Sequence, residues 1–147
     1  MSTKENKELI RQVIKERNEI VEDTAKLRSW CEKYYAPGLV HHLLPPKDLD
    51  WEQNMQYLAT VLSAIPDFNK SIDDMVAEGD KVVTRHTIQA THKATIAGIP
   101  ATGKHVSIKG SDIYKIEGNK ILEWWEFNDM LGLMTQIGAV ISPPPRK

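Results

Sequence analysis

Apolar residues recur at three- and four-residue spacing through the first 65 positions, the pattern of helices with one buried face. A first helix is predicted from a cap at position 2 or 3. Its residues at helical spacing are Leu9, Ile10, Val13, Ile14 and Arg17, and Ile20 and Val21 continue the stripe. A second is predicted from a cap at position 23 or 24, with an apolar face of Leu27, Trp30, Cys31, Tyr34 and Tyr35. The sequence Ala-Pro-Gly at 36–38 ends this helix. A third helix begins near Asp50 and stops at Pro66.

After the break at 36–38, "LVHHLLPP" is predicted to be a short extended stretch that begins at Leu39 and ends at Pro45 and Pro46. After Pro66 the hydrophobic period changes to two, which is typical of β-strands. Residues 68–92 and 105–129 each predict a hairpin, with turns at "AEGD" and "EGN", and the loop "IAGIPATGK" joins them. The final "MLGLMTQIGAVI" predicts a short helix or turn, with Gly138 as its stop.

Helices first and four antiparallel strands afterwards indicate an α+β fold, with the helices gathered on one face of a curved sheet. Such a sheet, folded over helices, leaves room for a pocket between the two layers. The 147 residues fit one domain. We expect this domain to span residues 1–141 and to be followed by a flexible proline-rich tail at 142–147.

The net charge of −1 argues against a nucleic-acid partner and gives no reason to expect a membrane surface. The single cysteine, Cys31, rules out an internal disulfide and a cysteine-based zinc site. The charged start of the chain does not resemble a signal peptide, and no apolar run approaches the length of a membrane span. We therefore expect a cytoplasmic protein.

Strand parity places several titratable groups on apolar faces. His86 and His92 share a face with Val82 and Ile88, and Asp112 shares one with four apolar neighbours, Val106, Ile108, Tyr114 and Ile116. In the last strand, one face is predicted to consist of Ile121, Glu123, Trp125, Phe127 and Asp129. A bulge would reverse every later position. Burial raises the pKa of a lone carboxyl, and such groups are often chemical.

Four segments in order carry a family resemblance: "EGDKVV", "GIPATGK", "DIYKI" and "DMLGLMTQIG". Together with "YYAPGLVHH" upstream, the chain resembles the SnoaL-like polyketide cyclases, also called SnoaL-like ester cyclases, from about Lys4 to Gly138. The resemblance implies an NTF2-like cone around a ligand cavity and an intramolecular aldol condensation without metal or organic cofactor. It also implies an acid/base role for Asp129 and matches His42 and His92 to histidines of the family pattern. The chain departs from that pattern at Trp124 and His86, which bears on the substrate.

An aldol cyclisation needs a base to remove a proton next to a carbonyl and a donor to stabilise the enolate. Asp129 is the predicted base, and His42, His92 or Tyr114 could donate. Asp112 fits the second role only if it is buried and neutral. The predicted ligand-binding residues are Trp125, Phe127, Tyr114, His86, Asp112 and Trp30. No histidine pair has the spacing of a known metal motif, so no metal is expected.

Each candidate also has a structural alternative. Asp129 could simply cap the last helix, and His86 could be an ordinary core histidine. Of the adjacent His41 and His42, we favour His42 as the inward-facing one. The tryptophans and tyrosines could be core residues rather than a ligand wall.

Two functions therefore remain open. The first is a cofactor-free cyclase or isomerase acting on a small hydrophobic carbonyl compound. The second is a non-catalytic pocket for a small hydrophobic ligand, or a dimeric interaction module. A homodimer is expected in either case.

Overall fold

The computed structural model describes residues 1–43, 47–139 and 143–147. The predicted end of the extended stretch, at Pro45 and Pro46, lies outside them, as does the predicted domain boundary at 141 and 142. The helices and strands are α1 (Thr3–Asn18), α2 (Thr24–Tyr34), β1 (Tyr35–His42), β2 (Asp48–Leu49), α3 (Trp51–Ala64), β3 (Asn69–Glu78), β4 (Lys81–Thr91), β5 (His105–Glu117), β6 (Lys120–Asn128) and α4 (Met130–Gln136).

The helices begin where their sequences provide caps. The side chains of Ser2, Asp23 and Asp50 accept hydrogen bonds from backbone N–H groups of the first turns of α1, α2 and α3. At α3 the side chain of Gln53 returns the bond to the backbone of Asp50, which completes a capping box. The three predicted helices are thereby confirmed.

The strands form one sheet in the order β2-β1-β6-β5-β4-β3. The hairpins β3–β4 and β5–β6 are antiparallel, and their turns use Gly79 and Gly118 at positive φ. β1 lies parallel to β6 and extends the sheet beyond the four predicted strands, with the two-residue β2 at its edge.

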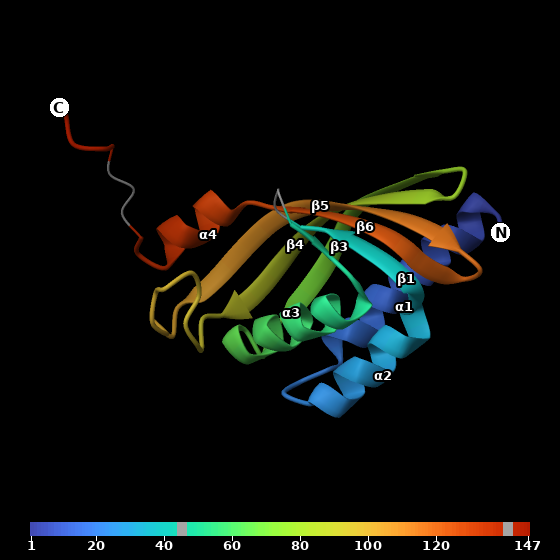
Figure 1. Ribbon diagram of the computed structural model, residues 1–147, viewed down its shortest axis with the longest axis horizontal. Helices are drawn as coiled ribbons and strands as arrows, with labels where there is room; N and C mark the ends of the chain where they lie inside the picture. Colours follow the sequence, from blue (N-terminus) through green and yellow to red (C-terminus); the bar gives the residue numbers. More distant parts are fainter. Residues whose placement is uncertain (44–46, 140–142) are drawn as a thin grey trace.

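The sheet curls over the helices, as Figure 1 shows, with α1, α2 and α3 on its concave side and α4 beyond the far end of β5 and β6. Buried side chains from all three of these helices and from β1, β4, β5 and β6 make up the main core. A smaller cluster includes Leu133 of α4 and Ile88, Val106 and Ile108 of the sheet. This arrangement confirms the α+β cone.

One boundary was predicted wrongly. The extended stretch was predicted to begin after Ala36-Pro37-Gly38. In the structure, β1 starts at Tyr35, directly after α2, so these three residues lie within the strand. Pro37 has no N–H to donate, and the register of β1 against β6 shifts between Tyr35 and Val40. The proline therefore occupies an irregular stretch of the strand where a ladder bond is not required.

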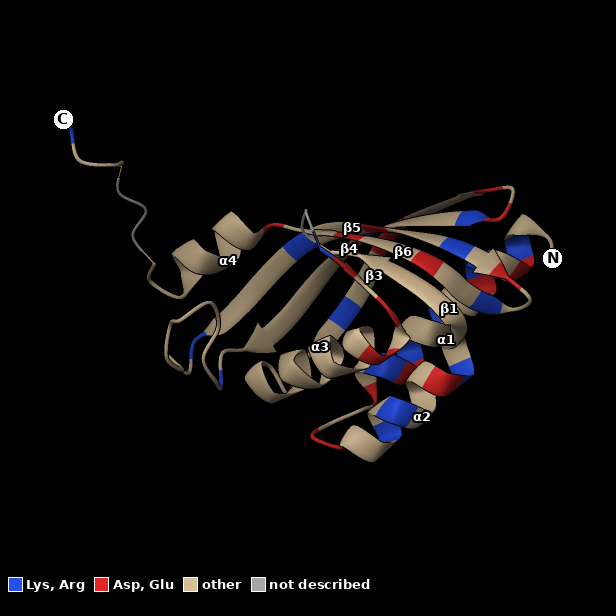
Figure 2. Ribbon diagram, in the orientation of Figure 1, with Lys and Arg blue, Asp and Glu red and all other residues tan. Residues whose placement is uncertain are grey.

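In the part of the chain that the structure describes, no helix is long and apolar enough to cross a membrane. Charged residues are dense on α1 and α2, whereas α3 and α4 carry few, as Figure 2 shows. The molecule thus has a weakly charged end formed by α3, α4 and the loop between β4 and β5.

Candidate active site

Two adjoining cavities lie between the helices and the concave face of the sheet. The inner cavity, of about 60 Å³, is lined by residues of α1, α2, α3 and the sheet. The outer cavity, of about 250 Å³, opens toward the weakly charged end and includes residues of α4 and of the β4–β5 loop. The two cavities share wall residues, namely Tyr57, Val61, Phe68, Ile88 and Glu126. The outer cavity approaches the lower limit of small-molecule sites, roughly 300 Å³.

Strand parity correctly predicts which side chains of β4 and β5 face the helices. Every second residue from Val82 to Ala90 is buried, and so are Val106, Ile108, Asp112, Tyr114 and Ile116. In β6 the prediction is wrong, because a bulge separates the pairs Ile116–Ile121 and Lys115–Glu123 and leaves one extra residue in β6.

The bulge exchanges the two faces of β6 after Ile121. Trp124 and Glu126 are buried toward the helices, whereas Trp125 is half-buried and Phe127 is 56% exposed. Neither Trp125 nor Phe127 borders either cavity, so their predicted place in a ligand wall is wrong.

Asp129 does not lie in an enclosed hollow. It is exposed and caps α4, with its Oδ1 accepting a hydrogen bond from the backbone N–H of Gly132 at 2.8 Å. The predicted burial of this carboxylate is therefore wrong, and the alternative of a helix cap describes its contacts. The flanking Met130 and Leu133 do border the outer cavity, which keeps Asp129 near its mouth.

The two adjacent histidines of β1 are oriented opposite to the prediction. His41 is fully buried and stacks on Trp124 with 3.9 Å between ring centroids. His42 points to the other face, where it stacks on Trp125 and its Nδ1 lies 2.9 Å from Asp48. His41 is thus the inward-facing histidine of the pair.

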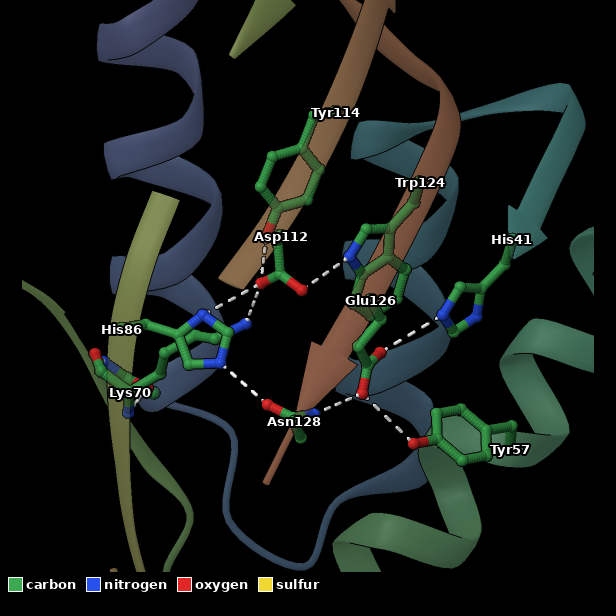
Figure 3. A network of polar contacts seen from close by, with 10 residues as sticks. His41, Tyr57, Lys70, His86, Asp112, Tyr114, Trp124, Glu126 and Asn128 are labelled. Carbon is green, nitrogen blue, oxygen red and sulfur yellow. Dashed lines mark hydrogen bonds and ion pairs between the residues drawn. The ribbon is translucent and has the colours of Figure 1, made fainter. Parts of the chain in front are cut away.

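Asp112 is buried at the centre of a polar network on the concave face (Figure 3). Its Oδ2 is 2.5 Å from Nζ of Lys70 and accepts a hydrogen bond from the hydroxyl of Tyr114 at 2.9 Å. Its Oδ1 accepts one from Nε1 of Trp124 at 3.1 Å. Burial alone would raise the pKa of this carboxyl, but the charge of Lys70, the nearby His86 and the hydrogen bonds from Lys70 and Trp124 hold it below its usual value. Asp112 is therefore charged, and it borders neither cavity.

His86 connects this network to a second one. Its Nδ1 is 3.3 Å from Oδ2 of Asp112, and its Nε2 is 2.8 Å from Oδ1 of Asn128. Burial and the nearby Lys70 lower the pKa of His86, so the ring is neutral at pH 7. Since Asn128 donates its amide N–H to Glu126, its oxygen faces Nε2 of His86. The contact between His86 and Asn128 lies directly over Gly110. A Cβ at that position would lie within 2.6 Å of both side chains, so the contact requires a glycine there.

Glu126 lines both cavities, and its carboxylate has polar contacts of its own, which Figure 3 shows. Its Oε1 accepts hydrogen bonds from Asn128 at 2.8 Å and from the hydroxyl of Tyr57 at 3.3 Å. Its Oε2 is 3.1 Å from Nε2 of His41, in ion-pair range but not aligned as a hydrogen bond. Burial and Glu126 raise the pKa of Tyr57 strongly, so its hydroxyl stays protonated.

The remaining predicted residues are divided between the cavity and the loop. Trp30 and Tyr114 line the inner cavity, and their contact with a ligand stays a prediction. His92 is fully buried at the end of β4, and its Nδ1 accepts hydrogen bonds from the backbone and hydroxyl of Thr102. It borders neither cavity, and its contacts tie down the β4–β5 loop. Among residues 1–43, 47–139 and 143–147, no cluster of three His, Cys, Asp or Glu side chains could hold a metal ion.

The sequence indicated some residues of the site and missed others. Arg17 was visible, because it continues the apolar stripe of α1 three residues after Ile14. Glu126 was misplaced by parity, since the bulge in β6 has no signature in the sequence. His41 was passed over because His42 was favoured as the inward-facing histidine of the pair. Tyr57 reaches the site from α3, and no local pattern connects it to β6.

Comparison with known proteins gives a consistent family assignment. The model of a family described as SnoaL-like polyketide cyclase matches residues 12–137. Comparison with curated protein sequences finds no match.

Several solved structures are similar over nearly their whole length. AclR of Streptomyces galilaeus, described as a candidate hydroxylase, is 25% identical with a TM-score of 0.83, over 97% of this chain and 87% of that one. TsrD of Streptomyces laurentii is 28% identical with a TM-score of 0.78, over 95% and 99%. A candidate polyketide cyclase from Acidithiobacillus ferrooxidans is 30% identical with a TM-score of 0.73, over 93% and 97%.

Proposed function

We propose that this chain, which belongs to the SnoaL-like polyketide cyclase family, is an acid/base catalyst of carbon–carbon bond formation or isomerisation in a small hydrophobic carbonyl compound. The observation that carries the proposal is the position of Glu126. Its carboxylate is 9% exposed, lies in the wall common to both cavities and is held by Tyr57 and Asn128. A carboxylate fixed at the edge of an apolar pocket is the arrangement that proton abstraction next to a carbonyl requires.

In the proposed reaction Glu126 removes a proton from the carbon next to a carbonyl, and the C–H electron pair becomes an enolate. The enolate carbon attacks a second carbonyl of the same molecule and forms the new C–C bond. The protonated Glu126 then returns its proton to the alkoxide, so the product is an isomer of the substrate and no other reactant is consumed. The hydroxyl of Tyr57 stays protonated and donates to Oε1 of Glu126 before the reaction; once Glu126 has taken up the proton, this hydroxyl can turn and donate to the developing oxygen charge instead.

Asp129 remains the competing assignment for the base, because it occupies the position of the acid/base in the family pattern. For that role its side chain would have to leave the N–H of Gly132 and turn toward the outer cavity. The loss of one N-cap bond costs about 1 kcal/mol, so such a rotation is energetically accessible. The two assignments differ in which carboxylate is essential.

Exchange of carbon-bound protons with solvent tests the proposal without knowledge of the natural substrate. Methyl 4-oxo-4-phenylbutanoate carries protons next to a ketone, and their replacement in D₂O can be followed by NMR. We expect the protein to accelerate this exchange and Glu126→Gln to lower the acceleration by about 10²-fold or more. Asp129→Asn is the matched control and should retain most of it.

The outcomes separate the alternatives. Loss of exchange in Asp129→Asn with retention in Glu126→Gln would move the base to Asp129. Binding of the ketone without any acceleration of exchange would favour the non-catalytic ligand-binding function. Both variants preserve side-chain shape, so thermal unfolding should show intact folds in each.

A further inference from the structure

The inner cavity contains a buried arginine without a charged partner. Arg17, on the last turn of α1, is 5% exposed and lines this cavity together with apolar residues such as Val13 and Trp30. Among the described residues, neither terminal nitrogen of its guanidinium has a hydrogen-bond partner, and no carboxylate lies in ion-pair range. Its one directed contact is with the ring of Phe68, whose centroid is 4.5 Å from Cζ.

The neighbours of Arg17 do not offset its charge. Burial lowers the pKa of Arg17, and the two groups that would act against this shift if they were charged are Tyr35 and Cys31. Burial raises the pKa of the Cys31 thiol to about 12 and that of the Tyr35 hydroxyl well above its usual value, so both are neutral. Lys70 also lines the inner cavity, but Asp112 compensates its charge. The other uncompensated charge in the cavity wall is the carboxylate of Glu126, which is not in ion-pair range of Arg17, so the guanidinium has no direct charged partner among the described residues.

The position of this charge is fixed by the fold. The amide of the adjacent Asn18 donates to the carbonyl of Lys70 at 2.9 Å and accepts from its N–H at 2.8 Å. These two bonds hold the end of α1 against the edge strand β3. The backbone of Arg17 is thereby fixed, and its buried guanidinium lies over the ring of Phe68 in the cavity wall.

An unpaired buried charge is costly, and a well-packed apolar side chain in its place is often neutral or stabilising. A guanidinium stays protonated and forms paired hydrogen bonds with a carboxylate. We propose that Arg17 binds a carboxylate group of the ligand in the inner cavity, so that the compound acted on is a keto acid rather than a neutral ketone or an ester. The binding of a carboxylate by Arg17 does not depend on the proposed function. Only the statement that the bound compound reacts at its ketone rests on that function.

The two cavities suit such a molecule. The inner cavity, about 60 Å³, accommodates a small polar group, whereas the larger outer cavity accommodates the apolar body. Glu126 lies between them, so a ketone joined to the carboxylate by a short carbon chain passes the catalytic carboxylate. A neutral compound would leave Arg17 unpaired and would be selected against.

Equilibrium binding of a matched pair of probes tests this inference. The probes are 4-oxo-4-phenylbutanoate and its methyl ester, which differ in the charge and size of one end. We expect calorimetry to show at least about tenfold tighter binding of the acid to the wild-type protein, the effect of a charge-assisted hydrogen bond. The preference should disappear in Arg17→Met and persist in Arg11→Met, which removes an exposed arginine of the same helix.

Thermal unfolding of the same variants separates a binding role from a structural one. We expect Arg17→Met to unfold at or above the temperature of the wild-type protein, because the substitution removes an uncompensated buried charge. A lower midpoint would assign Arg17 to stability and overturn the inference. Equal affinity for acid and ester, or no binding of the acid, would overturn it without any variant.

The same protein preparations distinguish this inference from the proposed function. Glu126→Gln should abolish proton exchange and still prefer the acid. Exchange without acid preference would refute the role of Arg17 alone, whereas acid preference without exchange would refute the role of Glu126 alone.

Discussion

Replacement of Lys70 by methionine tests whether the buried polar network stabilises the fold. The substitution keeps the length of the side chain and removes its charge. Asp112, which has no exposed surface, would keep Tyr114 and Trp124 as donors and lose the cation at 2.5 Å. An isolated buried charge of this kind costs about 3–5 kcal/mol. For a chain of this length, that loss lowers the thermal midpoint by roughly 10–15 °C.

Urea unfolding followed by circular dichroism measures this cost directly. The double variant Lys70→Met with Asp112→Asn removes both charges and should be more stable than Lys70→Met alone, since no uncompensated carboxylate is left. Lys33→Met, which disrupts a surface ion pair with Glu16, serves as the control and should leave the midpoint nearly unchanged. A loss of less than about 1 kcal/mol in Lys70→Met, or a double variant no more stable than it, would refute the reasoning.

Three further outcomes are expected. In Gly110→Ala the added Cβ would meet Asn128 Oδ1 at 2.3 Å and His86 Nε2 at 2.6 Å, so urea unfolding should show a loss of about 1–3 kcal/mol, and an unchanged midpoint would contradict the packing. Because burial lowers the pKa of His86 below 6.5, the unfolded chain binds more protons, and stability should fall as the pH drops below about 6.5. This fall should be smaller in His86→Gln, and equal slopes would contradict the assignment. Phe127 and Trp125 lie on the convex face, where we expect a second copy of the chain to pack. Phe127→Glu should therefore convert a dimer to a monomer in sedimentation. A wild-type protein that is already monomeric would refute this.

The fold was predictable because its elements carry local signals. The caps at Ser2, Asp23 and Asp50 and the positive-φ glycines of the two hairpin turns are all visible in the sequence. The parallel pairing of β1 with β6 was not, since it joins residues more than 80 positions apart and depends on how the sheet curls.

The candidate site was predictable only where strand alternation was unbroken. His86 and Asp112 were correctly placed on the concave face, because β4 and β5 pair without a register shift. A single bulge in β6 reversed the prediction for Glu126 and Phe127. Asp129 follows the end of that strand and was expected in the cavity for the same reason, although its sequence context also fitted a helix cap.

The location of the protein in the cell and its independence of cofactors stay predictions. The family assignment accounts for the cone and its cavity, whereas the chemistry depends on the side chains that border that cavity. In this chain Glu126 and Tyr57 border both cavities, and Arg17 borders the inner one.

A crystal structure with 4-oxo-4-phenylbutanoate bound would test the central claim most directly. We expect the carbon next to the ketone within about 3.5 Å of a carboxylate oxygen of Glu126, in reach for proton abstraction. We expect the carboxylate of the ligand to lie against Arg17 in the inner cavity. A ligand whose ketone lies against Asp129, or one bound outside both cavities, would contradict the assignment of Glu126 as the catalytic base.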